Sequence, residues 1–304
     1  MAQRANIVRS LKGLEEIIEL VEVDVFDPAP QKGWYFSGKF GPGKDPITGS
    51  KYLRELYLKT DPEFKGTTIP VLWDKKADYI VNNESSEIIR ILYPAFDSLL
   101  PAPLRETIKG PTGLLPTHLC NEIGEINEWV YNTINNGIYK CCFATVQAAY
   151  DDNIYPLFES FDRLEAHLAD PKYSGPYLFG DHITEADMKL YPTLIRFDVA
   201  YYMACKANLN MIRYSYPNLH RWLRTLYWDQ SGMARPAFSK TTKFERASQA
   251  HGAALYQYRT FTGDMIVPVG PKPDILPILN SRFTHAKIIF STKGEMAERS
   301  KALE

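Results

Sequence analysis

The stretch TTIPVLWDKKADYIVNNESSEIIRILYPAF, residues 67–96, determines the fold class of this chain. Two short apolar runs, TIPVLWD at 68–74 and DYIVNN at 78–83, are separated by the polar turn KKA, which predicts an antiparallel hairpin. The segment 82–96 then starts a helix, for which Ser85 or Ser86 is available as the N-terminal cap. A hairpin that leads into a helix indicates an α/β unit in this part of the chain.

Toward the N-terminus, the periodicity of the sequence changes twice. Residues 2–12 place their apolar side chains on one helical face, and Gly13 follows as a C-terminal cap. Valines alternate with acidic residues over 21–25, which predicts a half-buried strand. A Gly/Pro-rich loop over 27–50 and a short helix ended by Pro62 complete the unit. Residues 1–98 therefore predict the order helix, strand, helix, strand, strand, helix.

Toward the C-terminus, every predicted element is a helix. Helical spacing is present at 119–134, ended by Asn136-Gly137, at 146–168, with a bend at Pro156, and at 216–229. Thr184 and Asp187 have the spacing of a capping box, with Ile183 and Met188 placed for a hydrophobic staple. We expect a linker at 99–115, an all-helical domain at 116–280, and an irregular tail at 281–304.

Composition excludes several classes of function. The 304 residues are 45% hydrophobic with a net charge of −1, so no global field favours nucleic acid or a membrane surface. No apolar run reaches the length of a membrane span and no secretory leader is present, which predicts a cytoplasmic protein. The cysteines at 120, 141, 142 and 205 and the histidines lack metal-ligand spacing, and we interpret the cysteines as buried thiols.

Two local features suggest a site for a small thiol peptide on a thioredoxin-like domain. A cis bond before Pro70 would leave the backbone of Ile69 free to pair with a peptide as an added strand. The helix start at Ser85 offers free amides to a carboxylate, and Glu84 can take an ammonium group. A strand-initiating proline and a simple helix cap are the alternatives for these two features.

Four segments carry a resemblance to a known family. The segments at 68–90, 135–151, 182–198 and 216–229 resemble the xi class of glutathione transferases, the glutathionyl-hydroquinone reductases, which are relatives of the omega class. The likeness extends from residue 2 to about residue 238. It implies a thioredoxin-like domain followed by an all-α domain, glutathione as co-substrate, no metal, a small aromatic or quinol substrate, and a homodimer. The implied reaction is reduction of a glutathionyl-hydroquinone or a related glutathione transfer.

The resemblance also implies roles for individual residues. Tyr139 would stabilise a leaving phenolate through its hydroxyl. Tyr256 or Tyr258 would add an aromatic hydroxyl to the substrate pocket, although the sequence departs from the family after residue 240. The positions that would contact glutathione are Trp34, Arg54, Ile69, Glu84 and Ser85, with Pro70 as the cis proline.

One part of the family pattern is absent from these residues. The family has Cys-Pro-Trp-Ala before its first helix, and Met1 takes the place of the tryptophan, so its first strand and nucleophilic cysteine are missing here. A cysteine there would be a thiolate, because the helix N-terminus stabilises it. We expect a truncated start. The alternatives are a catalytically inactive glutathione-fold binding protein and glutathione conjugation in a specialised metabolic pathway.

Overall fold

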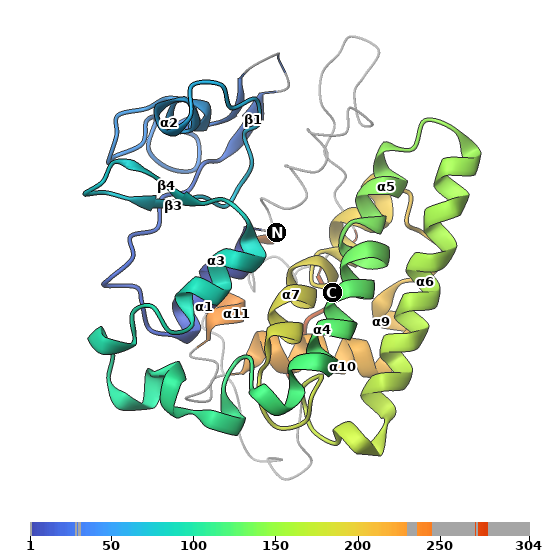
Figure 1. Ribbon diagram of the computed structural model, residues 1–304. Coiled ribbons are helices and arrows are strands. Elements are labelled where there is room, and N and C mark those ends of the chain that lie inside the picture. The colour runs from blue at the N-terminus through green and yellow to red at the C-terminus, as the bar shows by residue number, and fades with distance from the viewer. Residues whose placement is uncertain are drawn as a thin grey trace, which may run out of the picture.

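The N-terminal part of the chain combines helices with two small hairpins. The computed structural model describes residues 2–27, 29, 32–229, 236–244, 271 and 273–278. The elements are α1 (Gln3–Leu11), β1 (Val25–Asp27), β2 (Gly33–Tyr35), α2 (Leu53–Thr60), β3 (Leu72–Asp74), β4 (Tyr79–Asn82) and α3 (Ser85–Leu92). Figure 1 shows the hairpins and helix α2 in a lobe of their own, and helices α1 and α3 where this lobe meets the helical part.

Both hairpins are antiparallel. β1 pairs with β2, with Phe26 opposite Trp34, and β3 pairs with β4, with a register shift between Leu72 and Trp73. The second hairpin confirms the prediction made from residues 68–83. β2 begins at Gly33, where φ is +71° and an added Cβ would lie 2.2 Å from Thr67 Oγ1, so only glycine fits. The first hairpin therefore lies directly against the segment that leads into β3.

The hydrophobic core has a large and a small part. The small part is formed by Leu53, Leu56 and Tyr57 of α2, which pack against half-buried side chains of both hairpins. The large part joins α1 and α3 to the helical domain, since Ile7 and Val8 of α1 and Ile88 and Ile89 of α3 belong to the same buried cluster as the C-terminal helices. One continuous apolar core therefore connects the two parts of the chain.

The rest of the described chain is helical. Short 3₁₀ turns fill residues 97–119, and α11 returns to pack against α1 (Figure 1). The principal helices are α4 (Cys120–Trp129), continued by a π-helical segment (Val130–Asn135), α5 (Gly137–Phe143), α6 (Gln147–Ala169), α7 (Glu185–Leu194), a second π-helical segment (Phe197–Tyr201), α8 (Tyr202–Ala204), α9 (Ile212–Ser215), α10 (Pro217–Trp228) and α11 (Ala237–Thr241). Among the described helices, none is long and apolar enough to cross a membrane.

Two local predictions are wrong. The strand expected at 21–25 begins only at Val25. Its pairing partner is β2, a strand of three residues that lies within the loop expected to be irregular, and this partner pairs with Val25 to Asp27. Glu84 rather than a serine occupies the N-cap of α3, and Asn82 Oδ1 accepts the Glu84 amide at 2.7 Å. The helix end predicted at Asn136-Gly137 is confirmed, because the π-helical segment ends at Asn135 with Asn136 as its C-cap, and Gly137 then begins α5.

The predicted capping box is present. Asp187 Oδ2 accepts hydrogen bonds from the backbone amide of Thr184 at 2.9 Å and from its hydroxyl at 3.1 Å. Asp187 also accepts the indole N–H of Trp222 at 2.8 Å and the amide of Leu178 at 3.0 Å. This fully buried carboxylate thus fixes the start of α7 and joins it to α10.

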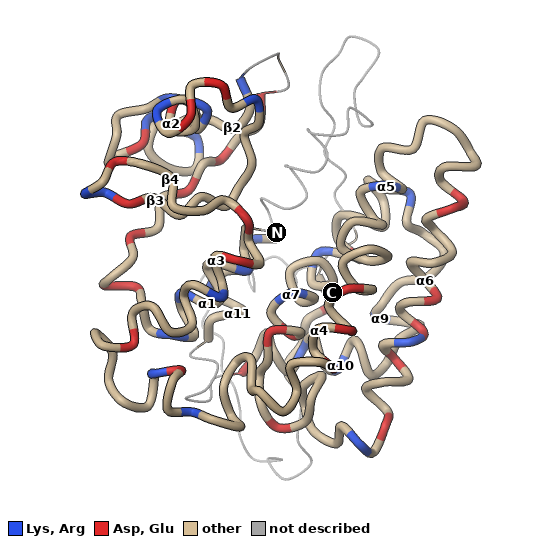
Figure 2. Tube along the Cα trace, in the orientation of Figure 1, with Lys and Arg blue, Asp and Glu red and all other residues tan. Residues whose placement is uncertain are grey.

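The two signs of charge are mixed over the molecule. Figure 2 shows Lys and Arg interspersed with Asp and Glu along both the α/β part and the helical part. This distribution agrees with the net charge of −1 over the whole sequence. The described residues therefore present no extended region of one sign.

Candidate functional site

The segment before β3 has the conformation predicted for a peptide-binding edge. The Ile69–Pro70 peptide bond is cis. Within the described part of the chain, the backbone N–H and C=O of Ile69 make no hydrogen bond. Both groups are therefore free to pair with an extended ligand, as strand addition requires.

Thr68 holds this segment in place from two sides. Tyr57 Oη of α2 donates to the Thr68 carbonyl at 2.8 Å, and Asn83 Nδ2 donates to Thr68 Oγ1 at 3.0 Å. Since Asn83 directly precedes the N-cap of α3, the second bond ties the cis-proline segment to the start of that helix. Sequence reasoning missed Thr68 and Asn83, because side-chain hydrogen bonds between distant residues produce no periodic pattern in the sequence.

The start of α3 offers donors to an anion. Glu84 is exposed and Ser85 is buried, with Ser85 on the first turn, where backbone amides have no intrahelical acceptor. Arg4 Nη1 donates to Ser85 Oγ at 3.4 Å, so the serine oxygen acts as an acceptor and its hydroxyl hydrogen is directed elsewhere. A carboxylate at this helix start would accept from both the hydroxyl and the amides.

Trp34 belongs to β2 and Arg54 to α2, two elements that meet at the small core. Trp34 in β2 packs against the α2 cluster, as does Ile69, and its ring meets Phe26 edge to face at 5.4 Å. Arg54 on α2 donates to the Lys65 carbonyl at 3.4 Å. The structure thus brings Trp34 and Ile69 to one cluster, and joins Ser85 to the cis-proline segment through Asn83. The hydrogen bond of Arg54 goes to the Lys65 carbonyl and joins it to neither group.

A further charged residue, Arg4, connects α1 with α3 and α7. Its side chain is 1% exposed, and its Nε and Nη2 atoms donate to the Lys189 carbonyl at 3.1 and 2.7 Å. Burial lowers the pKa of Arg4 to about 10, against the raising effect of Tyr131, Tyr139, Glu185 and Tyr201. Sequence reasoning missed Arg4, although a cation three residues before Ile7 on the apolar face of α1 was the available signal.

Tyr139 forms a pair with a second tyrosine. The hydroxyl oxygens of Tyr139 and Tyr201 are 3.2 Å apart, and their rings meet edge to face at 5.9 Å. Tyr139 is half-buried, whereas Tyr201 is buried, and burial raises the pKa of Tyr201 well above its ordinary value. The raised pKa keeps the Tyr201 hydroxyl protonated at neutral pH, and within the pair one hydroxyl donates its hydrogen to the other.

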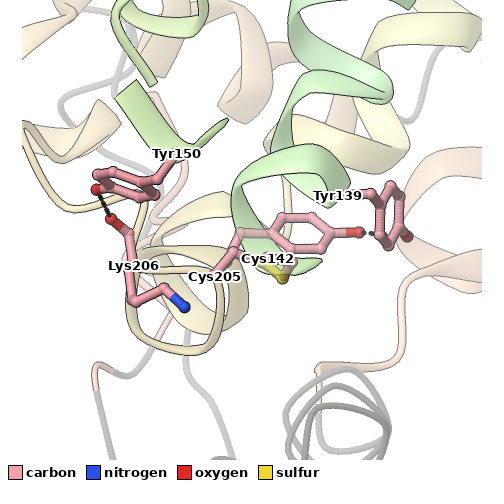
Figure 3. Close-up of a disulfide and its surroundings, with 6 residues drawn as sticks. Tyr139, Cys142, Tyr150, Cys205 and Lys206 are labelled. Atoms are coloured by element: carbon pink, nitrogen blue, oxygen red, sulfur yellow. Dashed lines mark hydrogen bonds between the residues drawn. A yellow bond between two sulfur atoms is a disulfide. The ribbon is translucent and has the colours of Figure 1, made fainter. Parts of the chain in front are cut away.

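A disulfide lies one helical turn from this pair, which corrects the interpretation of the cysteines. Cys142 on α5 is bonded to Cys205, 63 residues away, beside Tyr139 (Figure 3). Cys120 is exposed, and only Cys141 is a buried thiol, whose pKa burial raises to about 11. Adjacent residues on a helix point in directions about 100° apart, so Cys142 faces Cys205 while Cys141 does not.

Two of the predicted residues cannot be placed. Tyr256 and Tyr258 lie outside the described residues, as do most of the segment 244–271 and the tail 281–304. Within the described ranges, no group of three or more His, Cys, Asp or Glu side chains is arranged to hold a metal ion.

The fold and the site define a class of protein: a small α/β domain with a cis-proline edge, joined to a helical domain. Residues 1–93 match the family model of the glutathione S-transferase N-terminal domain, and residues 147–225 match that of the C-terminal domain. The chain belongs to the glutathione S-transferase family, a family of enzymes, and its N-terminal domain is thioredoxin-like, as predicted.

Curated relatives support this assignment along most of the chain. Glutathione S-transferase omega-like 2 of Schizosaccharomyces pombe is 41% identical over 275 residues, covering 90% of this chain and 83% of that protein. Glutathionyl-hydroquinone reductase PcpF of Sphingobium chlorophenolicum is 41% identical over 271 residues, covering 89% of this chain and 79% of that protein. Both agree with the predicted resemblance.

Solved structures agree as well. Glutathione transferase Xi 1 from Trametes versicolor is 43% identical, with a TM-score of 0.77, covering 91% of this chain and 89% of that one. The Xi glutathione transferase ECM4 from Saccharomyces cerevisiae in complex with glutathione is 35% identical, with a TM-score of 0.78, covering 91% and 90%. The relatives thus support glutathione-dependent transferase or reductase chemistry.

Proposed function

We propose that this protein binds glutathione at the cis-proline edge and reduces glutathionyl-hydroquinones or closely related aromatic adducts. The observation that carries the proposal is the joined unit of Ile69–Pro70 and the start of α3, held together by Asn83 and Thr68. A peptide backbone would pair with Ile69, and a carboxylate at Ser85 would lie at the other end of the same small ligand. Residues 1–98 would hold glutathione, and residues 116–280 would hold the aromatic group.

In the reaction that the resemblance implies, a thiolate at the N-terminus of α1 attacks the thioether sulfur of the adduct. The electrons of the broken carbon–sulfur bond pass to the ring, which takes up a proton, and a mixed disulfide forms on the protein. A second glutathione thiolate then releases glutathione disulfide by exchange. The cysteines of this sequence are residues 120, 141, 142 and 205, none of which belongs to α1.

The tyrosine pair supports the choice of a phenolic substrate. The hydroxyl oxygens of Tyr139 and Tyr201 lie 3.2 Å apart on the helical side of the molecule. The Tyr139 hydroxyl would donate to a phenol oxygen as negative charge develops on it, and the positive charge of Arg4 acts in the same direction. PcpF, by its name, acts on glutathionyl-hydroquinones, and the same class of substrate is proposed here.

The test uses the protein purified from its own cells. Glutathione affinity is measured by calorimetric titration, and conversion of a synthetic glutathionyl-hydroquinone to hydroquinone is followed by chromatography. Binding with turnover supports the proposal. Binding without turnover of this adduct would favour the non-catalytic or conjugating alternative, and absence of binding would contradict the site itself. Light scattering on the same sample tests the homodimer that we propose with this function.

A further inference from the structure

A pocket lined mostly by polar and charged residues lies between the two parts of the chain, beside the proposed glutathione residues. It has a volume of about 260 Å³ and opens between α3 and the continuous face of α4 and the following π-helical segment. Arg4 and Lys189 line it from α1 and α7, and Arg90 lines it from α3. The residues proposed to bind glutathione, Ser85 included, are not among its lining residues.

Three cations meet at this pocket, and they are incompletely neutralised. Arg90 binds Glu185 with two hydrogen bonds, Nε to Oε2 at 2.9 Å and Nη2 to Oε1 at 2.8 Å. Lys189 Nζ lies 2.8 Å from the same carboxylate, which is fully buried. One carboxylate therefore serves two cations, which leaves an excess positive charge before Arg4 is considered.

Arg4 adds a buried charge that contacts no carboxylate among the described residues. Within the described part of the chain, no carboxylate lies within 4.0 Å of its guanidinium, which donates only to the Lys189 carbonyl and the Ser85 hydroxyl. Although burial lowers the pKa of Arg4 to about 10, its guanidinium stays protonated at neutral pH. A buried cation without a counterion is costly in free energy, so an anion placed against it would be stabilised.

The remaining lining suits an organic anion more than an inorganic one. Asn127, Asn132 and Asn135 line the pocket, and side-chain amides can donate hydrogen bonds. Tyr131 supplies an aromatic wall that is 46% exposed, against which a planar group can pack. Glu128 also lines the pocket and is exposed, so its charge is well screened by water.

We propose that this pocket is a binding site for a small organic carboxylate, held by Arg4 and Lys189 at its base and by Arg90 at its side. The proposal goes beyond the proposed function, because it concerns a site next to that of glutathione and needs no turnover. The carboxylate would accept hydrogen bonds from the guanidinium groups, which is the geometry that arginine provides. A planar ring attached to it would lie along Tyr131.

Benzoate is the probe, and uncharged benzamide of the same shape is its control. Ligand-observed NMR at constant pH and salt measures binding of each to the full chain in the absence of glutathione. We expect benzoate to bind with one site per chain and benzamide at least about tenfold more weakly, because the loss of a charged hydrogen-bond partner is costly. Equal binding of the two compounds overturns the proposal.

Variants locate the site. Arg90→Gln and Lys189→Gln should each weaken benzoate binding about tenfold, whereas Arg221→Gln, which removes an exposed cation on α10, should leave it unchanged. Arg4→Gln should abolish benzoate binding. Arg4→Lys, which keeps the charge, should restore part of the binding, which would show that the loss in Arg4→Gln comes from the missing charge and not from misfolding. Unchanged affinity in Arg90→Gln and Lys189→Gln overturns the proposal.

Two further experiments distinguish this proposed site from the glutathione site and from a dimer interface. Asn83→Ala, which removes a bond to Thr68 and touches none of the three cations, should weaken glutathione binding and leave benzoate binding unchanged. Failure of one site therefore does not imply failure of the other. If benzoate does not bind while Arg90→Gln dissociates a dimer, the pocket receives an acidic side chain of a second copy, and the proposal is overturned.

Discussion

Asn83 and Thr68 are joined by a side-chain hydrogen bond of 3.0 Å that connects the start of α3 to the residue before the cis Ile69–Pro70 bond. The two features from which we predicted a thiol-peptide site are thus mechanically coupled. A ligand that touches both would meet a preorganised surface rather than two independent segments.

Removal of this bond should affect both stability and binding. For Asn83→Ala we expect a loss of about 1 kcal/mol in the free energy of unfolding, the usual contribution of one such hydrogen bond. Glutathione affinity should fall by about fivefold if the same energy is needed to order the site. Urea unfolding and calorimetric titration measure the two effects. Asn153→Ala on α6, which loses a bond to the Ala149 carbonyl, should leave glutathione affinity unchanged.

The serine pair at the start of α3 provides a matched test of the glutathione site. Ser85→Ala should weaken glutathione binding by about 1 to 3 kcal/mol, because a buried hydroxyl that faces a carboxylate is lost. Ser86→Ala, on the same helical turn but lining the neighbouring pocket, should bind glutathione as the parent does. Equal effects in the two variants, measured by calorimetry, would contradict the placement of the carboxylate at Ser85.

Glu185 should be the most sensitive carboxylate at the junction of the two domains. Glu185→Gln leaves Arg90 and Lys189 without their shared partner, and we expect a loss of about 3 kcal/mol, the lower end for buried pairs because Arg90 is half-exposed. Thermal and urea unfolding measure it. Glu122→Gln, which breaks an exposed pair with Lys172, is the control and should cost less than about 1 kcal/mol.

The buried pair of Lys12 and Asp97 predicts a specific acid sensitivity. Burial alone would raise the pKa of Asp97, but the hydrogen bonds from Lys12 at 2.8 Å and from the Thr107 amide at 2.8 Å lower it to about 2. Because the folded pKa lies below the unfolded value of about 3.9, the stabilisation is complete above that value and is lost as pH falls toward 2.

We expect Asp97 to contribute about 2 kcal/mol to this acid loss of stability. Asp97→Asn should flatten the dependence of unfolding free energy on pH between about 4 and 2. The free energy of unfolding is measured by urea titration at each pH. If it falls with pH as steeply in Asp97→Asn as in the parent protein, other carboxylates cause the loss of stability.

The disulfide predicts a thiol count. Alkylation of the denatured, non-reduced chain should modify two cysteines, Cys120 and Cys141, and reduction should raise the number to four. In the native state Cys120 should react first, because Cys141 is buried with a raised pKa. Mass spectrometry of the alkylated chain reports each number. Four reactive cysteines without reductant would show that Cys142 and Cys205 are free thiols.

Loss of this cross-link should also lower stability. Cys142→Ser should reduce the free energy of unfolding by about 2 to 4 kcal/mol, since a long loop is no longer closed in the unfolded chain. Cys141→Ser is the matched control at the adjacent position. Phenol binding compared in the two variants tests whether the cross-link also holds Tyr139 near Tyr201.

Periodic features were predictable from the sequence, and paired features were not. The second hairpin, the capping box of Thr184 and the helices with apolar stripes follow from local spacing, and the structure confirms them. β2 was missed because three residues, Gly33 to Tyr35, carry no alternation of their own, and only the ladder with β1 defines them. The disulfide was missed because Cys142 and Cys205 are distant in sequence.

The candidate site shows the same division. Ile69, Pro70 and Ser85 were found from local chemistry, since a proline at a strand start and a serine at a helix start have recognisable roles. Arg4 was missed, because its significance depends on what α7 and α3 place around it. The roles of Ile69, Pro70, Ser85 and Arg4 in ligand binding remain predictions, which the experiments above test.

The bond between Cys142 and Cys205 has a consequence for limited proteolysis. It closes a covalent ring that contains all of α6 and α7, from residue 142 to residue 205. A single protease cut within this ring, for example in the exposed residues before α6, leaves the two fragments linked. Electrophoresis would then show an intact chain without reductant and two bands with it, so digests of this protein must be compared under both conditions.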